Sequence, residues 1–319
     1  MTVFDTASKV IDMVAAARVK SEEFFTSDEW AKLSARSSWK GIALVAHCWL
    51  VIAGSMVIGV IWPITIPLMV LVIGNRQLGL FILMHDAAHG LLNPDRRIND
   101  RLALWLCGSE LNIYRPYHLQ HHRFVQQSED PDLVLSAPFP ITPASLRRKI
   151  IRDLTGQTFF KQRFGMLADQ LKARKSSTSG WTLLVLEARK QRVFLILNLL
   201  GFALFAVAGL WWAWLLMWLL PMATWLPLIS RLRNIAEHAL IVQNGTDPLR
   251  HARTTNANWL ERVFVAPYWV NYHCEHHMFT HIPCWNLPAA HRLLALKGVT
   301  GRMEVQPGYK TVLRLASQA

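Results

Sequence analysis

Residues 41–62, GIALVAHCWLVIAGSMVIGVIW, form an apolar run of 22 residues that contains no Lys, Arg, Asp or Glu. A helix rises about 1.5 Å per residue, so this run is long enough to cross the roughly 30 Å hydrocarbon core of a bilayer. The composition agrees, because 52% of the 319 residues are hydrophobic and 14 are tryptophan. A soluble protein with very apolar core helices is the alternative, and it fits poorly with an uncharged run of this length.

Three further apolar runs cover residues 64–84, 193–210 and 214–229. The first is separated from 41–62 only by Pro63, and the last two nearly merge through Trp211 and Trp212, which suit a membrane interface. The runs therefore predict an all-α integral membrane protein with four transmembrane helices in two hairpins. The long segments outside the hairpins predict a cytoplasmic helical domain that caps them.

The net charge of +13 follows this topology. Basic residues precede the first run, fill 147–192 and follow 231, whereas the two short turns carry no charge. The positive-inside rule then predicts that both termini and the middle segment face the cytoplasm, in a bacterial inner membrane. Nucleic acid is not an expected partner, because the basic residues track the spans and form no single patch. The prediction is one domain over 1–319: a lead-in at 1–40, hairpins at 41–84 and 193–230, and the cap at 85–192 and 231–319.

Cysteine usage gives a second indication of the compartment. The four cysteines show no CxxC spacing, and free thiols in a reducing compartment are expected.

Eight of the 13 histidines lie in three short boxes, HDAAH at 85–89, HLQHH at 118–122 and HCEHH at 273–277. Helical residues three or four apart share a face, whereas His121 and His122 diverge by about 100°. One HxxHH box can therefore serve two neighbouring metals, and histidine is a common ligand of iron, copper, zinc and nickel. A chance origin for three such boxes is disfavoured. The expected ligands are His85, His89, His118, His121, His122, His273, His276 and His277, around a dinuclear site.

The boxes resemble those of the integral-membrane fatty acid desaturase superfamily, and Asn271-Tyr272 before the third box strengthens the similarity. The resemblance implies two Fe²⁺ ions held by histidines alone, O₂ as co-substrate, and a ninth histidine outside the boxes. His238 is the best candidate, and Asn234, one helical turn earlier, could hold a metal-bound water. The same nine histidines are then the expected catalytic residues.

Acidic residues near the boxes are expected to orient imidazoles through their second nitrogen. The candidates are Asp86, Asp130, Asp132 and Glu275, with Glu237 as a similar case. His281 could face the site, although a peripheral position is favoured, and His47 is interpreted as structural.

The resemblance implies an O₂-dependent di-iron oxidoreductase that introduces a double bond into a lipid acyl chain. A hydroxylase, carotenoid ketolase or acyl-chain decarboxylase of the same superfamily stays open, because Met278–His281 departs from the usual desaturase pattern. Other classes are a membrane haem electron carrier and a metal-binding transporter. Both are disfavoured, because the boxes fall at span ends rather than within the spans. No His-Pro-Gly-Gly string of a fused cytochrome b5 occurs, so a separate ferredoxin, rubredoxin or cytochrome b5 is expected as electron donor. The oligomeric state is open.

Overall fold

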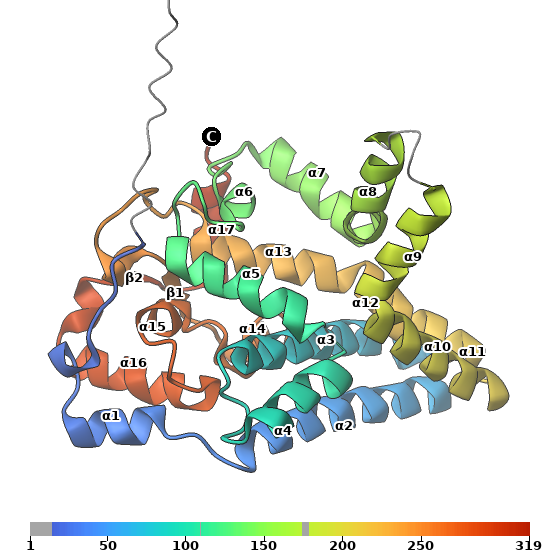
Figure 1. Ribbon diagram of the computed structural model, residues 1–319, viewed down its shortest axis with the longest axis horizontal. Coiled ribbons are helices and arrows are strands. Elements are labelled where there is room, and N and C mark those ends of the chain that lie inside the picture. Colours follow the sequence, from blue (N-terminus) through green and yellow to red (C-terminus); the bar gives the residue numbers. More distant parts are fainter. Residues whose placement is uncertain (1–14, 109, 174–178) are drawn as a thin grey trace, which may run out of the picture.

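The computed structural model describes residues 15–108, 110–173 and 179–319 (Figure 1). The fold is mostly helical, as predicted, apart from two three-residue strands. Strand β1 (Arg253–Thr255) pairs in parallel with β2 (Glu304–Gln306). Residues 1–14 of the predicted lead-in, and 109 and 174–178 of the predicted cap, lie outside the described residues.

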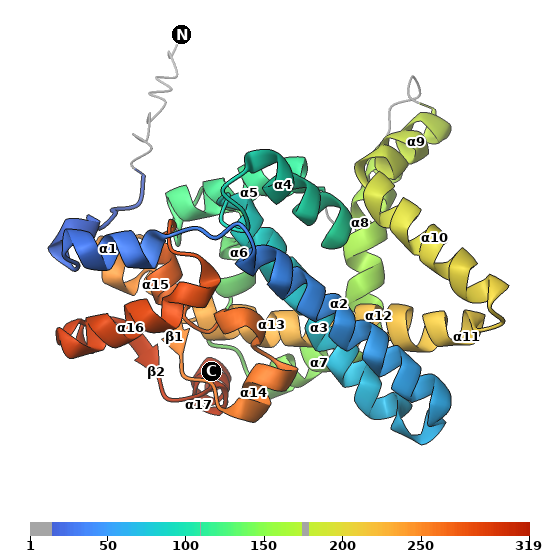
Figure 2. The same cartoon turned by 90° about the horizontal axis from the view of Figure 1, so that it is seen from below.

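The first two apolar runs form helices α2 (Lys40–Ile61) and α3 (Ile66–Ala88), joined by the 3-10 turn η2 (Pro63–Thr65). They lie side by side along their length (Figures 1 and 2). Both are long and apolar enough to cross a membrane, with mean hydropathies of 2.2 for α2 and 1.8 for Pro63–Ala88. Gly41, at the start of α2, contacts the backbone of Leu92 so closely that a Cβ atom there would overlap the Leu92 carbonyl oxygen. This contact ties the start of α2 to the loop that follows the first histidine box.

The region predicted as the second hairpin differs from the expectation. Helix α10 (Arg192–Val207) has 16 residues and is bent by 76° against α9 (Gly180–Lys190), so no straight span covers 193–210. The run after Trp211 extends instead to His238 and forms the third candidate span of the described residues. By length and hydropathy, a fourth candidate among the described residues is reached only if the bent pair α9–α10 is counted as one. Gln191, at the bend, has non-helical backbone angles.

The third candidate span is built from consecutive short pieces. These are α11 (Trp211–Trp214), the π-helix η4 (Leu215–Leu219), α12 (Leu220–Ala223) and α13 (Trp225–His238).

The cap surrounds the ends of α3 and α13 (Figure 1). Its N-terminal elements are η1 (Ser21–Glu23), α1 (Ser27–Ser34), α4 (Arg96–Arg101), the π-helix η3 (Leu102–Leu106), α5 (Leu111–Phe124), α6 (Leu133–Ser136), α7 (Pro143–Leu154) and α8 (Gln157–Ala173). Its C-terminal elements are η5 (Pro248–Arg250), α14 (Trp259–Phe264), η6 (Pro267–Trp269), α15 (His273–Met278), η7 (Cys284–Asn286), α16 (Leu287–Leu296), η8 (Val299–Gly301) and α17 (Tyr309–Ala316).

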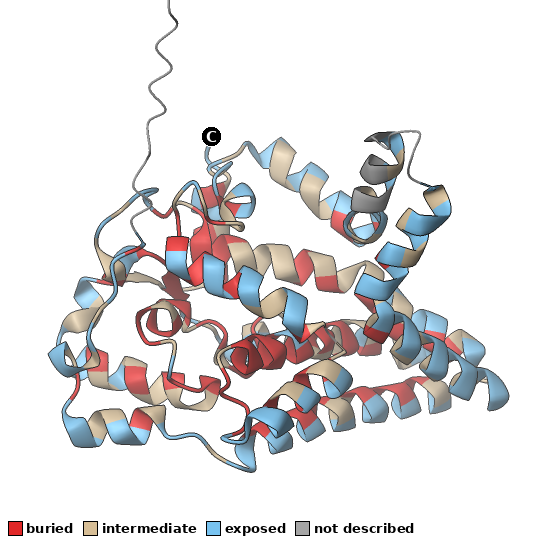
Figure 3. Cartoon of the chain, viewed as in Figure 1, coloured by how far each residue is buried: buried red, intermediate tan, exposed pale blue. Residues whose placement is uncertain are grey.

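Buried residues gather along α3, α13 and α15, while the outer faces of α2 and α10 are exposed (Figure 3). Those exposed faces carry large apolar side chains such as Leu50, Leu199 and Leu204. An apolar surface of this kind is expected where helices meet lipid rather than water. The four cysteines are buried free thiols, as predicted.

Candidate metal centre

Nine histidines that are far apart in the sequence meet where four helices converge. His85 comes from α3, His89 from the residue that ends it, three from α5, His238 from the end of α13 and three from α15. They form two groups, and within each group the candidate ligand nitrogens lie within 4.8 Å of one another. The five-histidine group is His85, His89, His118, His122 and His276, and the four-histidine group is His121, His238, His273 and His277.

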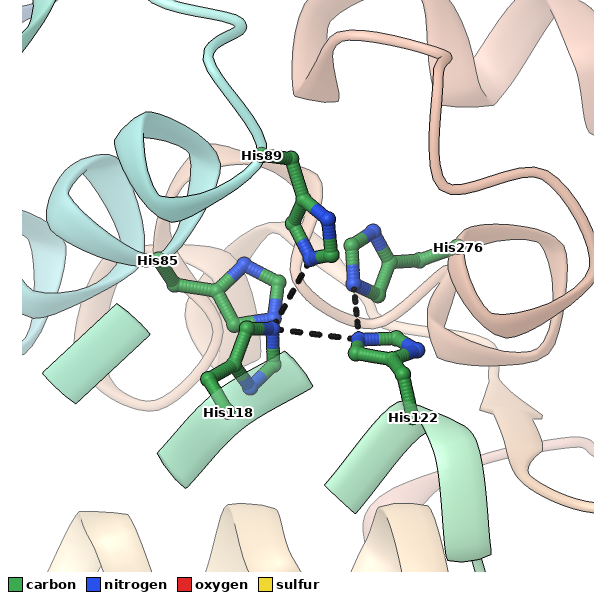
Figure 4. A group of neighbouring side chains, drawn as sticks. All are labelled: His85, His89, His118, His122 and His276. Carbon is green, nitrogen blue, oxygen red and sulfur yellow. Dashed lines mark hydrogen bonds between the residues drawn. The ribbon is translucent and has the colours of Figure 1, made fainter. Parts of the chain in front are cut away.

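In the five-histidine group the Nε2 atoms point toward a common centre (Figure 4). The Nε2 of His118 lies 2.9 Å from Nε2 of His89 and 3.1 Å from Nε2 of His122, and the latter lies 3.0 Å from Nε2 of His276. Neither ring nitrogen of His85 has a hydrogen-bond partner among the described residues. Imidazoles bound at right angles to one metal, with bonds of about 2.1 Å, have nitrogens about 3 Å apart. The donor set therefore fits a metal ion.

The four-histidine group has the same spacing. The Nε2 of His273 lies 2.9 Å from Nε2 of His238 and 3.1 Å from Nε2 of His277. The His121 ring lies 4.8 Å from the His238 ring and 5.0 Å from the His277 ring, measured between centroids. A second metal therefore fits next to the first.

Both HxxHH boxes are divided between the two groups. On α5, His118 and His122 belong to the five-histidine group and His121 to the other. On α15 the division is reversed, because the middle histidine, His276, joins the five-histidine group. This is the arrangement that the 100° step between successive helical residues predicts.

Burial favours the neutral, ligating form of these imidazoles. It lowers the pKa of His89 to about 3, with a smaller contribution from the positive charge on nearby His281. Burial, followed by neighbouring imidazoles, also lowers the pKa of other site histidines outside the candidate spans well below the usual value: His118, His122, His273, His276 and His277. A neutral imidazole keeps the lone pair that a metal requires.

One of the predicted acids contacts a box histidine directly. Asp130 accepts a hydrogen bond from Nδ1 of His121 at 2.8 Å, and both residues are buried. Asp130 also accepts hydrogen bonds from the backbone N–H groups of Gln126 and Asp132. The side chain of Asp132 is farther away, 3.8 Å from Nδ1 of His121, and accepts a hydrogen bond from Tyr117.

The other two predicted acids have different partners. Asp86 accepts a hydrogen bond from the backbone N–H of Cys284 at 2.9 Å and lies 3.6 Å from Nδ1 of His85, beyond hydrogen-bond distance. Glu275 binds the Thr254 hydroxyl and Nδ1 of His291, at 2.5 Å for the latter. The hydrogen bonds of Glu275 therefore connect α15 to β1 and α16, and neither of them reaches a box imidazole.

A family comparison accounts for the combination of apolar helices and histidine groups. The sequence model of the family described as "Fatty acid desaturase" matches residues 61–300. The chain belongs to this family. The resemblance predicted from the boxes is thereby confirmed, and the protein is a desaturase-family oxidoreductase with histidine clusters that can bind metal.

Related proteins of this family catalyse different reactions. Dihydrorhizobitoxine desaturase of Bradyrhizobium elkanii is 27% identical over 263 residues, which cover 77% of this chain and 70% of that protein. A beta-carotene ketolase of Paracoccus sp. (strain PC1) is 26% identical over 230 residues, which cover 66% of this chain and 73% of the ketolase. A second beta-carotene ketolase, from Paracoccus sp. (strain N81106 / MBIC 01143), is also 26% identical, over 231 residues.

One contact of this desaturase-family centre was not predicted. The Tyr114 ring stacks on His118, with 5.3 Å between centroids and 8° between planes. The signal was present in the sequence, because Tyr114 lies four residues before His118 and shares its helix face. Glu237, which was among the acids expected near the boxes, accepts a hydrogen bond from Arg233 at 2.7 Å, and its second oxygen lies 3.5 Å from Nε2 of His273.

Three candidates outside the boxes remain. Asn234 is half-buried one turn before His238, and its role stays a prediction. His281 is exposed, and Nδ1 of His47 lies 3.0 Å from the Tyr268 hydroxyl.

A cavity of about 250 Å³ leads to the centre from the cap surface. His122 and His277, one from each histidine group, are among its lining residues, together with Arg18, Trp30 and Phe279. The cavity offers small molecules a route to both groups.

Proposed function

We propose that this protein is a membrane-bound, O₂-dependent di-iron oxidoreductase that introduces a double bond into a lipid acyl chain. The observation that carries the proposal is the pair of adjoining, nitrogen-only histidine groups in a desaturase-family chain. The two groups touch, because the rings of His122 and His277 stack with 4.2 Å between centroids.

In this proposal the nine histidines of the two groups are the iron ligands, and the Asn234 side chain holds a water at the four-histidine group. Bound iron would supply the activation of O₂ and the oxidising power for an unactivated C–H bond. The protein orients the ligands: Asp130 keeps the proton of His121 on Nδ1, which leaves Nε2 free. Burial of the surrounding side chains excludes water from the reacting carbon.

The membrane arrangement is a further part of the proposal. We propose four spans in two hairpins, at 41–84 and 193–230, in a single domain, with α10 as the third span. The termini and the metal centre face the cytoplasm of a bacterial inner membrane. Electrons come from a separate donor of the ferredoxin, rubredoxin or cytochrome b5 type. The basic residues before α2 and between 147 and 192 support this orientation.

A carotenoid ketolase is the second candidate, because two of the related proteins are named beta-carotene ketolases. Hydroxylase and acyl-chain decarboxylase activities would use the same centre. The mass of the product separates these candidates. A desaturase removes two hydrogens, a hydroxylase adds one oxygen, and a ketolase converts a CH₂ group to a carbonyl.

The test is lipid and carotenoid mass spectrometry of a host that expresses the wild type, His121→Ala or His47→Asn. The expected product is an acyl chain lighter by two hydrogens in the wild type and His47→Asn, and absent in His121→Ala. Immunoblots of membranes establish that all three proteins insert. Equal amounts of product from the wild type and His121→Ala would refute the proposal. An oxygenated carotenoid as the product would identify ketolase activity instead of desaturation.

A further inference from the structure

Helix α7 carries positive charges that have no acidic partner. Arg148, Lys149 and Arg152 form no ion pair with any described acidic residue. The one acid of this helix, Asp153, is buried and bound by Arg231, with contacts of 2.5 Å to Nε and 2.9 Å to Nη2. The charge on α7 is therefore not balanced within the described chain.

The three cations border one shallow hollow on the surface, together with Ser145 and Ile151. Arg148 and Arg152 are four residues apart, and like charges at this spacing destabilise a helix. Burial, Arg231 and Arg152 lower the pKa of Lys149, with burial the largest cause. This face is therefore electrostatically unfavourable unless an anion lies against it.

Large apolar side chains are exposed beside the cations. They are Ile151 and Leu154 on α7, each 45% exposed, and Phe160 and Phe164 on α8, 57% and 53% exposed. A helix that presents basic and apolar side chains together is suited to the boundary between lipid headgroups and acyl chains. If this surface faced only water, these large apolar side chains would stay exposed to solvent, which is unfavourable.

Two contacts fix α7 and α8 near one end of each of the apolar runs 193–210 and 214–229. Arg231, which binds Asp153 of α7, lies on α13 just beyond the apolar run that ends at 229. The guanidinium of Arg163 on α8 lies 3.9 Å from the centroid of the Phe194 ring, at the start of α10. Figure 1 shows α7 running beside α13 toward α8 and α9. The contact of Asp153 with Arg231 thus holds α7 beside the end of the apolar run 214–229.

We propose that Arg148, Lys149 and Arg152 bind the phosphates of anionic phospholipids in the surrounding bilayer, and we call these three residues the headgroup site. Ile151, Leu154 and the two phenylalanines of α8 enter the acyl boundary beside it. The proposal rests on the membrane location proposed above but not on the reaction at the metal centre. A soluble acidic protein fits less well, because it would have to cover the interleaved apolar side chains.

Lipid binding by the purified full-length protein in a non-ionic detergent tests the headgroup site. Native mass spectrometry measures binding of phosphatidylglycerol and of phosphatidylcholine with identical acyl chains. The wild type is expected to bind phosphatidylglycerol at least about tenfold more tightly, because each basic residue near a headgroup strengthens binding several-fold. R148Q/K149Q/R152Q loses this preference. The matched control K32Q/R292Q/R302Q, which removes three cations from α1, α16 and the turn after η8, keeps it, and so does the charge-preserving R148K/R152K.

Size-exclusion profiles and metal content check that each variant is folded. If the triple variant does not fold, the wild type still tests the site, because raising the salt from about 0.1 M to about 1 M should abolish the preference. The proposal is overturned if the wild type shows no preference, if the control variant loses as much as the triple variant, or if the preference survives high salt. It is also overturned if inorganic phosphate at the lipid concentration displaces phosphatidylglycerol. The proposal is likewise overturned if R148Q/K149Q/R152Q binds phosphatidylglycerol as tightly as the wild type but no longer binds an acidic ferredoxin.

These results do not depend on enzymatic turnover. A protein that binds phosphatidylglycerol as expected but forms no desaturated product would refute the proposed function alone.

Discussion

The Nδ1 atom of His121 lies 2.8 Å from Oδ1 of Asp130, inside the cap and shielded from solvent. The same carboxylate accepts two backbone N–H groups, so its position is fixed independently of the imidazole. An anionic acceptor at this distance assigns the proton of His121 to Nδ1 and leaves Nε2 to the four-histidine group.

Asp130→Asn should weaken metal binding by about 10- to 100-fold, because the neutral amide orients and polarises His121 less strongly. Iron content after dialysis against increasing chelator concentrations measures the effect. Asp132→Asn is the matched control, because that carboxylate lies 3.8 Å from the same nitrogen. Equal retention of iron by both variants and the wild type would contradict the assigned role of Asp130.

Gly41→Ala should lower the free energy of unfolding by about 1–3 kcal/mol, since the added Cβ overlaps the Leu92 carbonyl oxygen and forces the backbone apart. Gly54→Ala on the same helix is the control, because a Cβ there meets nothing within 4 Å. That change should be neutral or stabilise the helix by about 0.5–1 kcal/mol. Denaturation in detergent measures both variants, and similar midpoints would argue against the close contact.

The metal-free protein should lose stability as the pH falls below about 6.5. Burial holds the pKa of His89 at about 3 in the folded protein, whereas the unfolded chain titrates at the ordinary value. Between these two values only the unfolded chain is protonated, so acid favours unfolding. Thermal midpoints of chelator-treated protein at several pH values check this, and His89→Asn should show a weaker dependence. A midpoint that is constant or rises on acidification would contradict the burial of neutral imidazoles.

His291→Ala should destabilise the fold by about 1–3 kcal/mol while leaving the iron content near that of the wild type. The substitution removes a hydrogen-bond partner of the fully buried Glu275 carboxylate but no ligand nitrogen. Thermal denaturation and iron analysis of the same preparation separate the two effects. Loss of iron without loss of stability would indicate that Glu275 acts on the metal centre directly.

The division of each HxxHH box between two metals could be predicted from the sequence because it depends on local helix geometry. The 100° step that separates His121 from His122 assigns them to different groups wherever α5 is placed. The resemblance implies a ninth histidine outside the boxes, and the position of His238 after an apolar run makes it the candidate. The run over 41–62 was equally clear, because an uncharged stretch of that length has few alternatives.

Features that depend on tertiary contacts could not be predicted in this way. The Glu275 carboxylate accepts hydrogen bonds from Thr254 and His291, which are 21 and 16 residues away in the sequence. The bend between α9 and α10 was also missed. Because α9 contains the charged residues Glu187 and Lys190, its apolar residues are assigned from the sequence to a basic segment. The bend itself cannot be predicted from composition.

The stacked rings of His122 and His277 belong to different histidine groups, with 29° between their planes. Replacing either residue removes the ring against which the other imidazole packs. If the proposed di-iron centre forms, spectroscopic signals from its two metals should consequently change together in single-residue variants. Labelling each position with an isotope, which leaves the packing intact, is the way to attribute a signal to one ion.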